Sequence, residues 1–281
     1  MSICFVTKGK KNAFSMKNGY IVRRGFLEKE VRMTMKLTVI GCYGGFPAAG
    51  EATSGYLFES DGFRLLVDCG SGVLSKLQQY IDLEELDAVL LSHYHHDHIA
   101  DIGPLQYAKL VGYHLGKSSG PLTIYGHTGD QEAFQRLSDD VHTKAKPYHP
   151  ADGIQIGPFQ IDFLKTIHPA ECYAMKIKTD DAVVVYTADS SYQDAFIPFS
   201  KNADLLIAES NFYVGQDGSG AGHMNSTEVG KIANEANVGE LFITHLPHFG
   251  RHKDLVNEAQ ALYTGSIQLA HSGLRWNKEG R

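Results

Sequence analysis

From Met35 onward the chain alternates short apolar runs with turn residues and amphipathic stretches. Runs of four to eight residues rich in β-branched and aromatic side chains are typical of β-strands. An Asp61-Gly62 pair between two of these runs predicts a hairpin, because this dipeptide suits a tight turn. We expect strands at residues 36–40, 56–59, 64–67, 88–91, 122–125, 159–166, 173–179, 182–186, 205–208 and 241–244.

Helical spacing of apolar residues appears in other segments. Residues 71–80 place Val73, Leu74, Leu77 and Tyr80 on one face of a helix. We expect further helices after Asp130 and at residues 227–236 and 254–263. Ser226 or Thr227 would cap the helix at 227–236. Strands and helices alternate without a linker, which favours one α/β domain over residues 35–281.

The first 34 residues differ from the rest of the chain in charge. They carry eight basic and two acidic residues, whereas the whole chain has a net charge of −6, so residues 35–281 carry −12. Residues 1–34 are interpreted either as a flexible basic arm or as leader sequence read from an upstream start codon. Met33 and Met35 directly precede the first strand, which favours the leader, and a native N-terminus near Met1 in mass spectrometry would refute it.

Composition narrows the class of protein. A hydrophobic fraction of 43% and a charged fraction of 21% are ordinary for a globular protein, and no apolar run approaches a membrane span. The four cysteines are scattered and form no C-x-x-C pair, which predicts a reduced, cytoplasmic protein. The acidic body disfavours a broad electrostatic grip on a long polyanion.

The strongest chemical signal is the segment His93-Tyr94-His95-His96-Asp97-His98, directly after the apolar run at 88–91. Imidazole and carboxylate groups are the ligands that zinc and similar first-row ions prefer. The alternative is a solvated loop that happens to be rich in histidine. Because the pattern H-x-H-x-D-H follows a buried strand, we favour a metal site.

This segment, together with three later ones, resembles the metallo-β-lactamase superfamily over most of residues 35–271. The later segments are Thr166-Ile167-His168-Pro169, Tyr186-Thr187-Ala188-Asp189 and Phe242-Ile243-Thr244-His245. The resemblance implies an α/β fold, the αβ/βα four-layer sandwich of that superfamily, with a metal site at one edge of the sheets. Asp68, in Asp68-Cys69-Gly70, matches the superfamily's early aspartate, which supports the site.

The resemblance also implies the ligands of two divalent metal ions, zinc or alternatively manganese. One ion would take His93, His95 and His168, and the other would take Asp97, His98 and His245. Asp189 would bridge the two ions, and His96 would take no part. For any one of these histidines, a purely structural hydrogen bond is the alternative.

Ligand identity narrows the branch of the superfamily. Asp189 stands where the zinc β-lactamases have cysteine, and His95 stands where the di-iron branch has glutamate. The remaining relatives are phosphodiesterases, thioesterases and lactonases. Glu209 and His223 resemble the glutamate and histidine of the tRNase Z branch, where the glutamate orients a histidine that protonates the leaving group. Asp97 would accept a proton as well as bind metal.

Two departures from the tRNase Z pattern concern the substrate. Met224 and Asn225 intervene between His223 and the Ser-Thr pair that usually follows it at once. His168 and Asp189 are only 21 positions apart, and residues 173–186 predict one tight hairpin, so the long tRNA-gripping arm of that branch has no room.

We therefore expect a dinuclear metal-dependent hydrolase that cleaves phosphodiesters, either RNA 3′ ends or small or cyclic nucleotide diesters, with a metal-bound hydroxide. A lactonase or thioesterase on the same site is one alternative, and a non-catalytic binding protein on this fold is another. Relatives often dimerise, so a homodimer without a membrane partner is expected.

Overall fold

The computed structural model describes residues 34–118, 120–139 and 141–278. Nearer the N-terminus it also describes the backbone of three short antiparallel strands, β1 (Met16–Lys17), β2 (Tyr20–Arg23) and β3 (Phe26–Lys29). Apart from these strands, residues 1–33 lie outside the described part of the chain. The interpretation of residues 1–34 as a leader or a basic arm therefore stays a prediction.

Two seven-stranded sheets form the centre of the described chain from Thr34 onward. The first has the order β17-β4-β5-β6-β7-β8-β9, and the second has the order β10-β11-β12-β13-β14-β15-β16. The strands of the first sheet are β4 (Lys36–Gly41), β5 (Gly55–Ser60), β6 (Phe63–Val67), β7 (Ala88–Leu90), β8 (Leu122–Gly126), β9 (Thr143–Pro147) and β17 (Arg275–Asn277). Those of the second are β10 (Ile154–Ile156), β11 (Phe159–Lys165), β12 (Tyr173–Lys178), β13 (Val183–Tyr186), β14 (Leu205–Glu209), β15 (Glu240–Thr244) and β16 (Ser266–Leu269).

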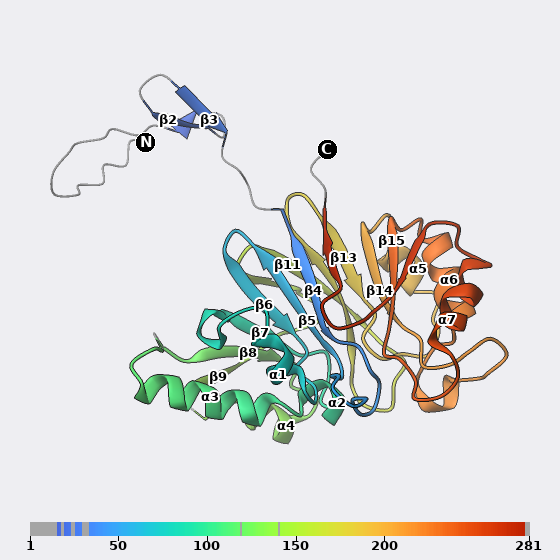
Figure 1. Cartoon of the computed structure of the whole chain (residues 1–281), viewed down its shortest axis with the longest axis horizontal. Helices are drawn as coiled ribbons and strands as arrows, with labels where there is room; N and C mark the ends of the chain where they lie inside the picture. Colours follow the sequence, from blue (N-terminus) through green and yellow to red (C-terminus); the bar gives the residue numbers. More distant parts are fainter. Residues whose placement is uncertain are drawn as a thin grey trace. The chain divides into compact units, whose positions relative to one another are not determined.

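Helices cover the outer face of each sheet (Figure 1). On the side of the first sheet lie α1 (Val73–Leu77), α2 (His96–Ile99), α3 (Ile102–His114) and α4 (Gln131–Gln135), with the 3-10 turn η1 (Leu83–Glu85). On the side of the second lie α5 (Phe196–Phe199), α6 (Ser226–Glu235) and α7 (His252–Gln260), and η2 (Ser219–Ala221) precedes α6. The predicted αβ/βα sandwich is thus confirmed. Within the described residues no helix has the length and apolar character needed to cross a membrane.

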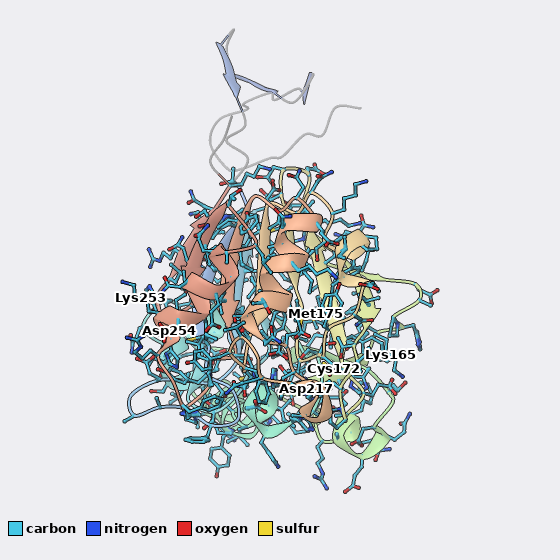
Figure 2. The ribbon with its side chains drawn as sticks, turned by 90° about the vertical axis from the view of Figure 1, so that its right-hand side faces the viewer. Lys165, Cys172, Met175, Asp217, Lys253 and Asp254 are labelled. Atoms are coloured by element: carbon cyan, nitrogen blue, oxygen red, sulfur yellow. The ribbon has the colours of Figure 1, made fainter. Side chains whose placement is uncertain are left out.

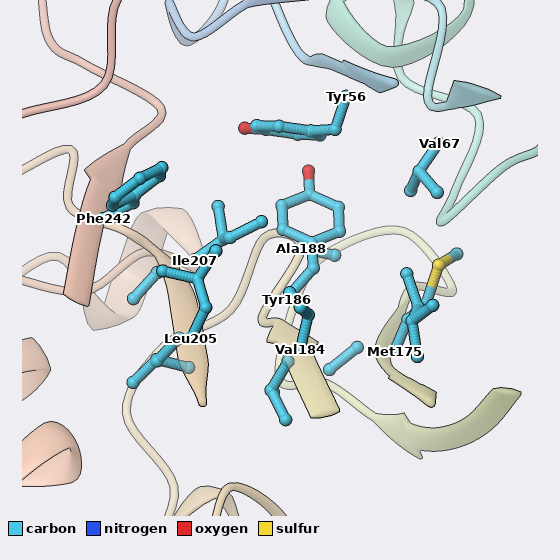
Figure 3. Packing of buried hydrophobic residues seen from close by; sticks show 14 of the residues in the cluster. Tyr56, Val67, Met175, Val184, Tyr186, Ala188, Leu205, Ile207 and Phe242 are labelled. Atoms are coloured by element: carbon cyan, nitrogen blue, oxygen red, sulfur yellow. The ribbon is translucent and has the colours of Figure 1, made fainter. Parts of the chain in front are cut away.

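The main hydrophobic core lies between the two sheets. Figure 3 shows Tyr56 of the first sheet above Tyr186 of the second, with ring centroids 4.8 Å apart. The Tyr56 hydroxyl is 2.7 Å from Thr244 Oγ1, and the Tyr186 hydroxyl donates to Asp68 Oδ2 over 3.0 Å. The core therefore ends in hydrogen bonds to residues at the edge of the sheets, which fixes that edge.

Burial separates the apolar side chains from the charged ones in the second sheet and its helices. In Figure 2, Cys172 and Met175 lie inside the molecule, and both are fully buried. Lys165 and Lys253 stand at its margin and are exposed. Fully burying a side chain of methionine size contributes about 1.5–3 kcal/mol, so this interior supplies the main favourable free energy of folding.

The predicted hairpin between His168 and Asp189 is present. β12 and β13 pair antiparallel, and Lys178 lies opposite Val183, so only residues 179–182 form the turn. The predicted cap of α6 was wrong. Asn225 is the N-cap residue, because its Oδ1 accepts from the backbone nitrogens of Thr227 and Glu228. Ser226 instead begins the helix and donates to Glu258.

Candidate metal centre

The predicted site residues lie where strands end. His93 follows β7 of the first sheet, and His168 follows β11 of the second. Asp189 follows β13, and His245 directly follows β15. β13, β14 and β15 pair in parallel, so their carboxyl ends share one edge of the second sheet. Side chains that are more than 150 positions apart in sequence therefore meet there.

The structure brings all seven predicted ligands together in two groups that share Asp189. Within each group the ligand atoms lie within 4.8 Å of one another. The first group comprises His93, His95, His168 and Asp189, and the second comprises Asp97, His98, Asp189 and His245.

The side-chain atoms inside the two groups lie close together. His168 Nε2 lies 3.0 Å from His95 Nδ1, and His245 Nε2 lies 3.1 Å from Asp97 Oδ2. Asp189 Oδ2 is 3.7 Å from His93 Nε2 and 3.3 Å from His98 Nε2. Asp189 is therefore placed so that its carboxylate faces both groups.

Three polar atoms at this centre are buried without a hydrogen-bond partner: His93 Nε2, His98 Nε2 and Asp189 Oδ1. A buried polar atom without a partner costs about 1–3 kcal/mol, and three of them at one point call for a common partner. Imidazole nitrogens around a carboxylate make up the donor set that zinc and related ions bind. The residues present therefore fit divalent metal ions.

Asp68 orients the buried side of the centre. Its carboxylate accepts from the Ser92 backbone nitrogen and hydroxyl, both over 2.8 Å, and from the Tyr186 hydroxyl. It also accepts from His98 Nδ1 over 2.7 Å, which leaves His98 Nε2 directed into the centre. Carboxylate–histidine contacts of this kind fix the ring and raise its basicity. The structure thus gives Asp68 the supporting position that the resemblance implies.

The charges of the centre shift several pKa values. Burial lowers the pKa of His93 well below its usual range. Burial alone would also lower the pKa of His98, but the carboxylates of Asp189 and Asp68 raise it well above the usual range. For Asp97, burial opposes ionisation, yet the hydrogen bond from His245 and the charge of His98 hold its pKa well below normal. Asp97 is therefore a carboxylate.

The backbone around the centre is held in unusual conformations. Asp68, Ala188 and His245 have φ values of 57°, 50° and 54°, in the left-handed region that non-glycine residues rarely adopt. Such residues cost about 1–3 kcal/mol each and persist where the surrounding structure enforces them. Gly44 leaves no room for a side chain, because an added Cβ would lie 2.6 Å from the His245 ring. Strained backbone thus occurs at one predicted ligand, His245, and at two residues beside the centre, Asp68 and Ala188.

Glu209 and His223 lie together beside the second group. Glu209 is fully buried at the end of β14, and its Oε1 is 2.9 Å from His223 Nδ1. Its carboxylate also accepts from the backbone nitrogens of Ser190, Asn211 and Met224. Burial opposes the charge of His223, but the hydrogen bond and charge of Glu209 raise its pKa to about 9. His223 is thus held in its protonated form beside the metal ligands.

The ring of His223 faces two predicted ligands. It stacks on His245 at a centroid distance of 5.0 Å and lies edge-on to His168 at 5.4 Å. His96, by contrast, is exposed on α2 and belongs to neither ligand group, as expected.

A cleft of about 410 Å³ opens over the centre. Phe46, Asn211 and Phe249 are among its lining residues that were not predicted as part of the site. Asn211 Nδ2 donates to the His245 carbonyl oxygen, and the Gly45 backbone nitrogen donates to Asp97 Oδ2 over 2.8 Å. The available signal for the loop was Gly44-Gly45-Phe46, a glycine pair followed by an aromatic residue between the strands expected at 36–40 and 56–59.

Comparison with known proteins agrees with this geometry. The family model described as "Beta-lactamase superfamily domain" matches residues 63–246 of this chain. The probable metallo-hydrolase YhfI of Bacillus subtilis (strain 168) is 64% identical over 242 residues, which cover 86% of this chain and 99% of the relative. The crystal structure of YhfI, a metallo-beta-lactamase fold protein, gives a TM-score of 0.86 at 63% identity, over 87% of this chain and 100% of that chain.

More distant similarities are found to a ribonuclease Z and to a diphosphatase. A ribonuclease Z of Methanopyrus kandleri (strain AV19) is 26% identical, with 82% of this chain and 80% of the relative covered. The crystal structure of a diphosphatase from the PhnP family gives a TM-score of 0.68 at 20% identity, over 87% of this chain and 98% of that chain. The second likeness shows a shared fold.

Proposed function

The chain is a metallo-hydrolase of the beta-lactamase superfamily, and from this premise we propose that it is a dinuclear phosphodiesterase of the tRNase Z-like branch. The observation that carries the proposal is the Glu209–His223 pair beside the second ligand group. Hydrolysis of a phosphodiester needs a proton for the departing oxygen, and this pair supplies a protonated imidazole next to the centre.

Two divalent ions bound by the seven ligands would polarise the phosphate and lower the pKa of a water molecule toward neutrality. The chain's own groups complete the reaction. Asp97, held as a carboxylate by His245 and the Gly45 nitrogen, is placed to accept a hydrogen bond and a proton from the attacking water. His223 donates its Nε2 proton to the leaving oxygen, while Glu209 keeps Nδ1 hydrogen-bonded and the ring in place.

The shape of the site favours a small diester over tRNA. The turn between β12 and β13 spans residues 179–182, so the chain has no arm between His168 and Asp189. A cleft of about 410 Å³ suits a small molecule, since such sites typically measure ~300–1,000 Å³. Among the described residues that line it there is neither lysine nor arginine, which disfavours a polyphosphate or a long nucleic-acid backbone.

A substrate screen of the zinc- and manganese-loaded protein tests the proposal. We expect turnover of bis(p-nitrophenyl) phosphate and of small or cyclic nucleotide diesters, and little or none of a 3′-extended pre-tRNA. Lactones or thioesters turned over faster by orders of magnitude would show that the same centre polarises a carbonyl instead. Failure to take up any metal on reconstitution would favour a binding protein.

Three finer proposals accompany this one. We propose zinc as the main ion, because histidine dominates the ligand set, with manganese as the alternative. We propose a cytoplasmic setting, because Cys42, Cys69 and Cys172 are buried free thiols. We also propose a homodimer, by analogy with relatives on this fold.

A further inference from the structure

Two phenylalanine rings stand exposed at the mouth of the cleft. Phe46 is 62% exposed and Phe249 is 47% exposed, although both line the same cleft as His95, Asp97 and His223. Neither belongs to the hydrophobic core of the fold. The exposed part of each ring packs against no other side chain of the core, so it is available to a ligand.

Phe46 is held rigidly from behind. Its ring stacks on His248 with centroids 3.7 Å apart and an angle of 3° between the planes. His248 Nε2 donates to the carbonyl oxygens of Phe46, over 2.7 Å, and Gly44, over 3.2 Å. The Tyr43 ring also stacks on His248, with centroids 5.4 Å apart. The loop that carries Phe46 is therefore set before any ligand arrives.

This loop is also tied to the metal ligands. Gly45, next to Phe46, donates its backbone nitrogen to Asp97 Oδ2. The position of the Phe46 ring is thus coupled through one residue to the carboxylate that we place in catalysis.

Phe249 is supported by two other aromatic rings. Its ring packs against Phe212 and Tyr213 with centroids 6.4 Å and 5.7 Å away. The Tyr213 hydroxyl donates to the Phe249 carbonyl oxygen over 2.9 Å. Phe212 in turn lies 6.5 Å from the ring of His223, the proposed proton donor.

We propose that Phe46 and Phe249 form an aromatic platform that receives the base of the substrate, which makes the substrate class nucleoside phosphodiesters. This inference deepens the proposed function and rests on it. A rigid aromatic ring binds any base through its π-face, at little cost in conformational entropy. The platform would thus select for the presence of a base without a strong preference for its identity.

Two substrates with the same leaving group test the platform. Thymidine 5′-(p-nitrophenyl phosphate) carries a base, and methyl p-nitrophenyl phosphate does not. For Phe46→Leu and Phe249→Leu, which keep apolar bulk but remove the ring, we expect kcat/KM on the thymidine ester to fall about tenfold, mainly through KM. On the methyl ester the loss should stay within twofold, and Phe46→Trp should restore the thymidine ester.

Tyr107→Leu is the matched control, because Tyr107 is an aromatic residue of α3 that is 71% exposed and lies outside this cleft. It should behave as the unsubstituted protein on both esters. Equal losses on the two esters in Phe46→Leu and Phe249→Leu would overturn the platform while leaving the phosphodiesterase proposal intact.

Binding gives a second readout that does not depend on turnover. Calorimetric titration of the metal-loaded protein with thymidine 5′-phosphate and with 2-deoxyribose 5-phosphate compares two ligands that differ only by the base. We expect the nucleotide to bind about tenfold tighter and Phe46→Leu to abolish that difference. If the two bind equally, the platform is refuted. If neither ester is hydrolysed but the difference is seen, the phosphodiesterase proposal fails and the base site stands.

Discussion

The floor of the cleft and its mouth are built in opposite ways. At the floor, His93, His98 and Asp189 are buried. Ser92 holds His93 Nδ1 and Asp68 holds His98 Nδ1 by hydrogen bonds. At the mouth, Phe46 and Phe249 are exposed and are supported only from behind. The difference indicates a division of labour, because preorganised buried groups suit bond cleavage, whereas an open apolar rim suits the selection of a ligand.

The largest effect should come from breaking the floor at the residue shared by both ligand groups. Asp189→Ala removes the carboxylate that faces His93 and His98, so we expect hydrolysis to fall below detection and the metal content to drop by at least one ion per chain. Elemental analysis and turnover of bis(p-nitrophenyl) phosphate measure both.

The matched control is His96→Ala. His96 is exposed on the same segment as His95 and Asp97 but belongs to neither ligand group. Loss of metal in His96→Ala, or full metal content in Asp189→Ala, would show that the ligands are assigned wrongly.

The next largest effect on the rate should come from removing His223, the proposed proton donor. His223→Ala should cost about 100-fold or more on a diester with a poor leaving group, since a positioned acid contributes ~10²–10⁴-fold. On p-nitrophenolate, which needs no proton, the loss should be about tenfold at most. Steady-state rates on an alkyl and a nitrophenyl diester give the comparison, and equal losses would remove His223 as the acid.

The same residue predicts a dependence on pH. Glu209 raises the pKa of His223 to about 9, so the acid is protonated below that value and loses its proton as the pH rises through it. With the poor leaving group, kcat should therefore fall above about pH 9. Glu209→Gln removes the negative charge, so the fall should move to lower pH; an unchanged profile would contradict the role of Glu209.

A smaller effect is expected from the support behind the floor. Asp68→Asn keeps the shape but weakens the hydrogen bond that orients His98, so metal affinity should fall by about 10–100-fold. Competition with a chromophoric chelator measures the affinity. Asp87→Asn, on a surface residue whose Oδ2 accepts from the Arg64 backbone nitrogen, is the control and should leave metal affinity unchanged.

The smallest effect should come from a change in the loop that carries Phe46. Gly50, in the loop that carries Phe46, has φ 75° and open space around it. Gly50→Ala therefore adds backbone strain alone, and we expect the free energy of unfolding to fall by about 1 kcal/mol, or ~2–4 °C in Tm. Gly103→Ala, in helix α3 with equally open space, should instead raise Tm slightly. Calorimetry compares the two variants.

Most strands, and the residues that meet at the candidate metal centre, could be predicted from sequence, because each depends on a local pattern. The apolar run at 88–91 gave β7, and the histidine segment directly after it supplied four of the ligands. Helix α3 was missed. Its start contains Gly103 and Pro104, and Tyr107 and Val111 leave apolar surface exposed, so no clean buried stripe marks it.

The mouth of the cleft could not be predicted for a different reason. Phe46 and His248 stack on each other although they are about 200 positions apart, and neither lies in a motif of the superfamily. Only the pairing of elements from the two sheets brings them together. The N-cap of α6 could not be predicted either, because Asn225, Ser226 and Thr227 are three adjacent polar residues that can all cap a helix. Local geometry decides for Asn225, whose side chain accepts from two backbone nitrogens.

The seven predicted ligands come from segments that follow strands of both sheets. His93 and His95 lie between β7 and α2, Asp97 and His98 lie in α2, and the other three follow β11, β13 and β15. Bound ions would join the two halves of the chain as cross-links do. A ligand that binds only the folded state stabilises it by about 4 kcal/mol at a free concentration 1,000 times its Kd. The supply of metal would then set the lifetime of the folded chain as well as its rate of reaction. A cell short of metal would therefore lose the protein to proteolysis.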